Sequence, residues 1–105
     1  MRVISRRPLR DFWEIHPQAK APLSAWFRVM EQTKFADFNA IKATFSAADY
    51  VAPFTIFDVG GNKFRLIAAI HYNTGRVYVR HVFSHPEYDK WSDEMQRRKR
   101  PKRHK

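Results

Sequence analysis

The sequence predicts an α+β fold in which two N-terminal helices pack on one face of a small antiparallel sheet. Apolar side chains recur at helical spacing in two stretches before residue 32, whereas three stretches after residue 51 alternate with the period of a strand. Short turns rich in glycine and asparagine separate these later stretches. The predicted order is β-α-α-β-β-β with a short C-terminal segment, which leaves the second face of the sheet partly open.

Two helices are expected after a short strand-forming stretch at residues 2–5. The first lies within residues 6–17 and the second begins near residue 19; their apolar stripes are Leu9, Phe12, Trp13 and His16, and Leu23, Trp26, Phe27 and Met30. Pro17 separates the helices, because the residue before a proline is driven out of the helical region. Aromatic stripes also surround some ligands, but an amphipathic helix must bury its apolar face, so both stripes are expected to pack on the sheet.

Three antiparallel strands joined by tight turns are expected in residues 52–59, 63–72 and 76–84. The Gly60-Gly61-Asn62 turn lacks the longer glycine pattern and the following helix of a phosphate-binding loop, so a hairpin is the better interpretation. Residues 34–50 follow no clear period and are expected to form an irregular connection over the core. The segment 85–91 is expected either as a short last helix or as an extended end.

Charge is concentrated at the C-terminal end of the chain. The net charge is +10, and the last ten residues hold seven Lys or Arg and no acidic residue. We therefore expect one domain over residues 1–95 and a basic, flexible tail over residues 96–105. A basic run of this density binds polyanions by releasing their counterions, although such a run also serves as a solvated, solubilising terminus.

The composition excludes several classes of function. The chain has no cysteine, which removes disulfides, thiolate metal sites and a cysteine nucleophile, and which fits a reducing compartment. The N-terminal residues lack the apolar core of a signal peptide, and the longest aliphatic run, LIAAI, is too short to span a bilayer. We therefore expect a cytoplasmic protein without a membrane partner.

Strand alternation places a group of cations on the open face of the predicted sheet. Phe64 and Val77 are expected to face the helices, and the opposite face then carries Lys63, Arg65, Arg76, Tyr78 and Arg80. Guanidinium groups bind phosphate through paired hydrogen bonds and a tyrosine ring stacks on a base, so this face is a candidate RNA platform. The alternative is that these cations only make the protein soluble.

Two side chains that exchange protons, His85 and Tyr88, follow the last predicted strand. RNA cleavage without a metal needs a base for the ribose 2′-OH, an acid for the departing 5′ oxygen and fixed positive charge for the phosphate. Histidine exchanges protons near neutral pH, and tyrosine acts as a base only where nearby cations lower its pKa. The alternative interpretation is that His85-Pro86-Glu87 is only a helix start.

The other histidines are not expected to take part in the chemistry. In the predicted register His81 faces the core, so it is interpreted as a packed side chain. His16 and His71 have no second His, Asp or Glu at the spacing of a metal site, and no bound metal is expected.

Three segments carry a resemblance to a known family: LRDFWEIHPQAKAPLSAW, FDVGGNKFRLIAAIHY and VYVRHVFSHPEYDK. From about Ser5 to Lys90 the chain resembles the HigB toxins of bacterial type II toxin–antitoxin modules, which are related to the RelE toxins. The resemblance implies a compact RelE-like α+β fold and an endoribonuclease, an mRNA interferase, that enters the ribosomal A site and cuts mRNA without a cofactor. It also implies a HigA-like helix-turn-helix antitoxin that neutralises the toxin and represses the operon, so that operator DNA is bound only through the complex.

The same resemblance implies a role for individual residues. Arg65 and Arg80 match the two sheet arginines, which would hold the scissile phosphate. His85 and Tyr88 match the histidine and tyrosine of the C-terminal motif, with His85 as the first candidate for proton transfer. Tyr88 would be its partner or a platform on which a base stacks.

Further residues are assigned to RNA binding or stand apart from the family pattern. Lys63 and Lys90 match basic positions more loosely, and together with Tyr78 and Arg76 they are predicted to contact RNA. The family usually has Asn at the position of Asp58, just before the Gly-Gly turn, so the role of this position is left open.

Two other functions are compatible with the residues. One is a toxin of the same fold that binds a protein such as gyrase, as the related ParE toxins do. The other is an RNA-binding module without catalysis. The His85–Tyr88 pair favours the nuclease over the gyrase-binding toxin, because that branch generally lacks such a pair.

Overall fold

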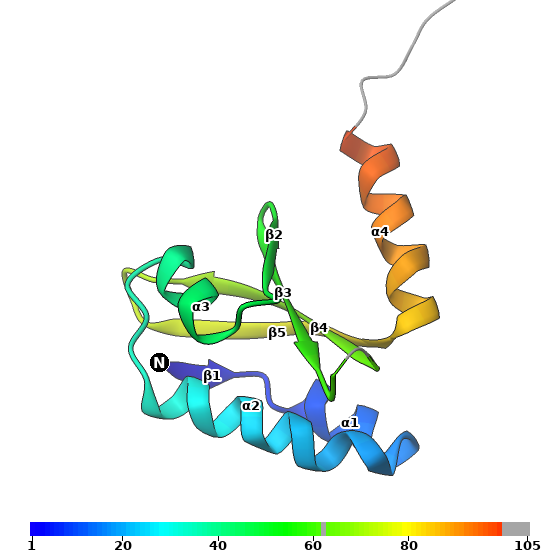
Figure 1. Ribbon diagram of the computed structural model, residues 1–105, viewed down its shortest axis with the longest axis horizontal. Helices are drawn as coiled ribbons and strands as arrows, with labels where there is room; N and C mark the ends of the chain where they lie inside the picture. The colour runs from blue at the N-terminus through cyan, green and yellow to red at the C-terminus, as the bar shows by residue number, and fades with distance from the viewer. Residues whose placement is uncertain (62, 100–105) are drawn as a thin grey trace, which may run out of the picture.

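The fold is a five-stranded sheet with helices on both of its faces (Figure 1). A computed structural model describes residues 1–61 and 63–99. In chain order its elements are β1 (Arg2–Ile4), α1 (Arg7–Ile15), the short 3-10 helix η1 (Pro17–Ala19), α2 (Lys20–Gln32), α3 (Phe38–Thr44), β2 (Asp49–Val51), β3 (Phe54–Val59), β4 (Phe64–His71), β5 (Arg76–Ser84) and α4 (His85–Lys99). The sheet order is β1-β5-β4-β3-β2. The predicted α+β class is confirmed, but the sheet is mixed, because β1 pairs with β5 in parallel.

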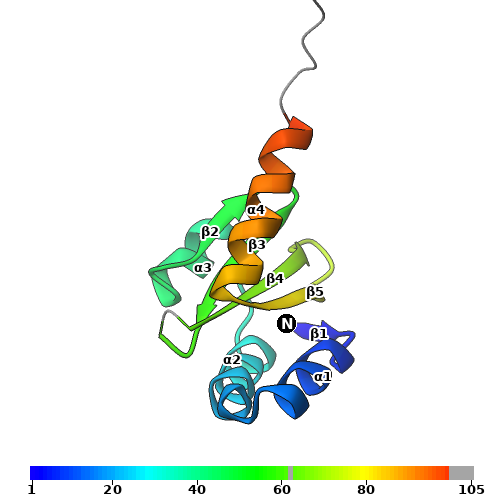
Figure 2. The ribbon, with the colours of Figure 1, turned by 90° about the vertical axis from the view of Figure 1, so that its right-hand side faces the viewer.

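The two N-terminal helices cover one face of the sheet (Figures 1 and 2). Of the apolar stripes that the sequence predicts, α1 buries Leu9 and Phe12, and α2 buries Leu23, Trp26 and Met30. They join one core with the strand residues of this face, which include Phe57, Leu66 and Val77. The prediction that both stripes pack on the sheet is therefore confirmed.

The connection between α2 and β3 is more regular than the sequence indicates. α3 begins after Asp37, whose Oδ1 accepts a hydrogen bond from the Ala40 backbone N–H at 3.0 Å and so caps the helix. Phe35 and Ile41 are buried, so the segment covers the core as predicted. The expectation of an irregular connection is wrong, because a helix of two turns and a strand of three residues are too short to show a clear period.

A tight turn joins β3 to β4 and sets their register. Gly60 has a φ of +67°, a conformation that glycine adopts without strain, and its carbonyl accepts a hydrogen bond from the Lys63 N–H at 3.3 Å. The predicted hairpin is confirmed, and it places Asp58 directly opposite Arg65. Paired residues of neighbouring strands project to the same side, so both side chains lie on the face opposite α1 and α2.

A β-bulge interrupts the pairing of β4 with β5. Ile67 of β4 is opposite His81, whereas the next residue of β4 is opposite Val79, so Arg80 is an extra residue on β5. The extra residue reverses the alternation of the strand, and both Val79 before it and Val82 after it pack against the core. His81 therefore lies on the open face. The prediction that His81 faces the core is wrong, because strict alternation takes no account of a bulge.

The last helix, α4, contacts the sheet at the adjoining ends of β4 and β5, and its later turns project beyond the sheet (Figures 1 and 2). It runs to Lys99, so it is much longer than the short final helix expected for residues 85–91. α4 also passes through residue 96, where the basic tail was expected to begin, and residues 100–105 of that tail lie outside the described part of the chain. Among the helices of residues 1–61 and 63–99, none is long and apolar enough to cross a bilayer.

Candidate active site

The junction between β5 and α4 fixes His85 at the start of a helix. The backbone N–H of Ser84, the last residue of β5, donates a hydrogen bond to Glu87 Oε1 at 2.8 Å. This contact is one half of a capping box, in which a glutamate of the first turn bonds the residue before the helix. Pro86 fits this turn because a helix start leaves its first N–H groups without helical partners. The motif therefore begins a helix, and the same cap defines where His85 lies.

The His85 side chain has an acidic neighbour one turn along α4. Its Nδ1 lies 3.3 Å from Asp89 Oδ2, and the His85 side chain is 50% exposed. The carboxylate orients the imidazole, and Nε2 lies on the far edge of the ring. A histidine that is held through one nitrogen and exposed to solvent is suited to pass a proton through the other.

Arg65 of β4 contacts both a carboxylate and an aromatic ring. Its Nε lies 3.0 Å from Asp58 Oδ1, and the two side chains are only 12% and 23% exposed. Its guanidinium carbon lies 5.6 Å from the centroid of the Tyr88 ring, within the range of a cation–π contact. Nη1 also donates a hydrogen bond to the Phe64 carbonyl at 3.3 Å. The guanidinium is therefore fixed in position, and Asp58 compensates part of its charge.

The environment of Tyr88 keeps its phenol protonated. Burial is the largest influence and raises the pKa of Tyr88, while a hydrogen bond with Ser92 and the charge of Arg65 lower it to a smaller extent. Nearby carboxylates, those of Asp49 and Asp58, raise the pKa further. The condition for Tyr88 to act as a base, a pKa lowered by cations, is not met. The side chain is suited instead to donate a hydrogen bond or a proton.

An aromatic cluster joins the first turns of α4 to the open face of the sheet. At its centre, the Trp91 ring centroid lies 5.8, 5.9, 6.1 and 6.2 Å from those of Phe54, Tyr88, Phe83 and His81. Aromatic pairs at such distances contribute about 0.5–1.5 kcal/mol each beyond the area that they bury. The cluster sets the orientation of α4 on the sheet, and with it the positions of Tyr88 and His85.

His81 lies at the exposed edge of this cluster. It stacks on Phe83, with 5.0 Å between centroids and 13° between ring planes. Burial is the larger cause and the Arg80 charge the smaller one, and both lower the pKa of His81. The prediction of a packed histidine is therefore wrong, because His81 is exposed and contacts the rings of the open face on one side only.

Three of the predicted cationic residues are exposed, two at this end of the sheet and one in the middle of β5. Arg80 is the extra residue of the bulge, Lys63 belongs to the β3–β4 turn and Lys90 lies in the second turn of α4. Their exposure leaves them accessible to a polyanion. The exposed positive charge here therefore comes from these residues and not from Arg65, which is mostly buried.

Two predicted RNA-binding residues, Arg76 and Tyr78, lie at the opposite end of β5. A strand rises by about 3.3 Å per residue, which puts them roughly 20–26 Å from Ser84. Tyr78 packs edge-on against His71, with ring centroids 5.2 Å apart. Both residues share the open face with Arg65, but they do not adjoin His85. Alternation predicts which face of the sheet a residue occupies, and it does not predict how far along the strand the residue lies from α4.

Two acidic side chains near the site contact its proposed functional residues. Asp58 pairs with Arg65, and Asp89 lies against His85. Within residues 1–61 and 63–99, no three His, Cys, Asp or Glu side chains are grouped closely enough to hold a metal ion.

Comparison of the sequence with known proteins shows which family the chain belongs to. Residues 19–91 match the HigB_toxin family, which is described as the RelE-like toxic component of a toxin–antitoxin system. The chain belongs to the HigB toxin family. It is 33% identical over 92 residues to the mRNA interferase toxin HigB of Escherichia coli K12, which covers 85% of this chain and 88% of that protein. The same identity and coverage hold for proteins named mRNA interferase HigB from Escherichia coli O157:H7 and Shigella flexneri. The resemblance inferred from the sequence is thus confirmed.

Three residues of this site in the HigB-family toxin were given no role from the sequence: Asp58, Asp89 and Trp91. Counting outward from the Gly60 turn would have placed Asp58 opposite Arg65, because a tight hairpin fixes the register. Helical spacing from the His85 motif would have found the other two, since Asp89 is four residues after His85 and Trp91 three after Tyr88. Recognising them required the segment to be assigned as a helix first.

Proposed function

We propose that the protein is an mRNA interferase, the toxin of a type II toxin–antitoxin module, and that it inhibits translation in the cytoplasm by cutting mRNA in the ribosomal A site. The observation that carries the proposal is the position of the Tyr88 ring against the Arg65 guanidinium, with His85 one turn earlier on the same helix. The relatives named as mRNA interferases at 33% identity support it.

In the proposed reaction, the ribose 2′ oxygen attacks the adjacent phosphorus. A base removes the proton of the 2′-OH, the bond from phosphorus to the 5′ oxygen breaks, and an acid protonates the departing oxygen. The products are a 2′,3′-cyclic phosphate and a 5′-OH end. Because both proton transfers use protein side chains and the phosphate charge is balanced by arginine, the proposed step is metal-independent.

Roles for the residues follow from their settings. His85 transfers a proton through Nε2 while Asp89 holds Nδ1. Tyr88, whose pKa is raised by burial, donates a hydrogen bond or a proton. Arg65 and Arg80 stabilise the charge of the transition state, one from a fixed position and one from the exposed bulge.

The remaining cations bind RNA outside the reacting centre. Lys63 and Lys90 would contact phosphates next to the cut, because both are exposed at this end of the sheet. Arg76 and Tyr78 would contact nucleotides farther along the strand, where the tyrosine ring offers a stacking surface.

The proposed partners are the ribosome, mRNA and a HigA-like helix-turn-helix antitoxin. The family description, a toxic component of a toxin–antitoxin system, supports an antitoxin partner. Operator DNA would be reached only through the complex with this antitoxin.

A reconstituted translation system tests the proposal by primer extension on mRNA, with and without ribosomes and with and without EDTA. His85→Ala is expected to reduce cleavage by about 10²–10⁴-fold, the usual range for losing a proton-transfer group. The side chain is half exposed, so the variant should fold normally. A matched control is Glu94→Ala, an exposed residue of the same helix, which should cut like the wild type.

Chemistry at the ends of the product separates the possible mechanisms. Attack by the 2′ oxygen leaves a 5′-OH end, and a 2′-deoxy nucleotide before the cut should abolish cleavage. A 5′-phosphate end, or cleavage lost in EDTA although the ribosomes remain intact, would reject the proposed step. Growth arrest without any cuts would instead point to a protein target.

A further inference from the structure

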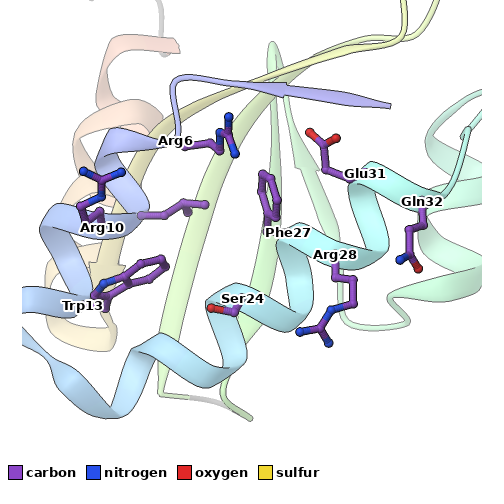
Figure 3. A pocket seen from close by; sticks show the side chains of 9 residues that line it. Arg6, Arg10, Trp13, Ser24, Phe27, Arg28, Glu31 and Gln32 are labelled. Atoms are coloured by element: carbon purple, nitrogen blue, oxygen red, sulfur yellow. The ribbon is translucent and has the colours of Figure 1, made fainter.

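A groove lies between α1 and α2 (Figure 3), and both helices lie on the side of the sheet opposite α4 (Figure 1). Its volume is about 700 Å³. Residues of both helices line it at intervals of one turn, and those that matter here are Arg6, Arg10, Trp13, Phe27, Arg28 and Glu31. None of them belongs to the candidate active site. The groove is therefore a separate feature of the surface.

The inner wall of the groove is apolar. Trp13 of α1 and Phe27 of α2 project into the space between the helices (Figure 3), and both are only partly buried although they pack against the core. Leu9, which is 2% exposed, lies beneath them. An amphipathic helix normally buries the aromatic side chains of its apolar face. Rings that stay partly exposed in a concave surface therefore indicate a binding site for apolar groups.

The rim of the groove is cationic. Three arginines surround the apolar wall, and the Arg6 guanidinium carbon lies 5.3 Å from the centroid of the Phe27 ring. In the part of the chain that the structure describes, Arg10 and Arg28 form no ion pair. The carboxylate of the groove, Glu31, is already engaged, because its Oε2 accepts a hydrogen bond from the Val3 N–H at 2.8 Å. The rim thus offers two exposed guanidinium groups to a ligand.

We propose that the α1–α2 groove is a docking site for an acidic, amphipathic segment of a partner protein. Apolar side chains of the segment would pack on Trp13 and Phe27, while its carboxylates would form paired hydrogen bonds with Arg10 and Arg28. The groove lies between two helices, and a concavity of this kind accepts the apolar face of a third helix, whereas a nucleic acid would engage only the arginines and the exposed faces of the rings. The combination favours a protein segment over RNA.

The size of the groove limits the occupant. Between Ser24 and Glu31, α2 rises by about 10 Å, so the groove accepts about two turns of a helix with one or two large apolar side chains. Because α1 and α2 lie on the far side of the sheet from α4 (Figure 2), this segment would leave the candidate active site uncovered. The proposal therefore goes beyond the nuclease function and does not depend on it.

Fluorescence anisotropy with a synthetic amphipathic helix peptide, leucine on one face and glutamate on the other, tests the proposal. Arg10→Glu combined with Arg28→Glu is expected to weaken binding of this peptide by roughly tenfold or more, because two attractive contacts become repulsive. The control, Arg7→Glu combined with Lys34→Glu, changes the net charge equally at exposed positions outside the groove and should weaken binding less than about threefold. Thermal unfolding of both variants verifies that they are folded.

Amide and indole chemical shifts of the wild-type protein locate the binding site without any variant. The peptide should move the Trp13 indole signal and leave that of Trp91 in place. Equal weakening in the two charge variants, no binding, or shifts centred on Trp91 would overturn the proposal. A single-stranded RNA oligonucleotide that moves the Trp13 signal and displaces the peptide would also overturn it and assign the groove to nucleic acid.

Discussion

The two faces of the sheet differ in what their side chains do. On the side of α1 and α2, Phe57 is fully buried, and its ring lies 5.4 Å from Trp26 and 5.0 Å from Phe45. On the side of α4, the rings are partly exposed and enclose an ion pair between Arg65 and Asp58. One face provides the stability of the fold, and the other holds charged and proton-exchanging groups in fixed positions. The division shows how a small domain keeps a polar site without weakening its core.

The largest difference between the faces should appear in the free energy of unfolding. Phe57→Ala is expected to lower it by about 3–5 kcal/mol, because the change leaves a cavity in a core that is fully packed. Phe83→Ala on the open face should cost about 1–2 kcal/mol, since that ring is partly exposed. Urea denaturation monitored by tryptophan fluorescence measures both values. Similar costs for the two variants would remove the proposed division between the faces.

A smaller effect is expected from releasing the charge of Arg65. Asp58→Asn keeps the shape of the side chain but removes its negative charge, so RNA affinity should rise and its dependence on salt should steepen by about 0.7 in the log–log slope, as for one added phosphate contact. The stability cost should be about 1–3 kcal/mol, because the change leaves a mostly buried guanidinium without its charged partner. Binding of a non-cleavable RNA across a salt series gives the slope. Asp11→Asn, on α1, is the control, and an equal change in both variants would contradict a local effect at Arg65.

The smallest effect should come from His81 and concerns the dependence of stability on pH. Its pKa is lower in the folded protein than the usual value of 6.5, so the unfolded chain binds more protons below that pH. The stability contributed by the neutral ring is complete above pH 6.5 and is lost as the pH falls through the folded-state pKa. His81→Phe keeps the stack on Phe83 and should flatten the decline in thermal unfolding midpoint between about pH 7 and 5. An unchanged decline would show that other groups cause it.

Elements with a long, uniform pattern were predictable from the sequence. The stripes of α1 and α2 and the alternation of β4 follow one period throughout, and the Gly60 turn left little freedom in the register. α3 and β2 were missed because each is shorter than the window in which a period becomes visible. The length of α4 was missed because most of its residues are charged or polar and show no clear apolar period. Its few aromatic side chains pack only in the first turns.

At the site, residue types were predictable but their arrangement was not. Arg65 and Tyr88 were selected for their chemistry, and their direct contact became visible only when α4 was placed on the sheet. The bulge at Arg80 changed the face of His81, and such an insertion leaves no mark in a strand whose residues all favour extended backbone. From the sequence, Asp58 stood out only as a departure from the family pattern, and its ion pair with Arg65 showed what it contacts.

The part of α4 beyond the sheet sets the distance between the site and the outer end of the helix. The aromatic cluster holds the first turns of α4 against the sheet. From His85 to Arg97 the helix rises by about 18 Å. A cation at its outer end is thus held at a set distance and in a set direction from the proton-exchanging groups. Adding or removing one residue in the free part would change the distance by about 1.5 Å and rotate the charge by about 100° around the helix axis. The length of the helix, and not any contact of the cation itself, therefore sets how far this positive charge lies from the site.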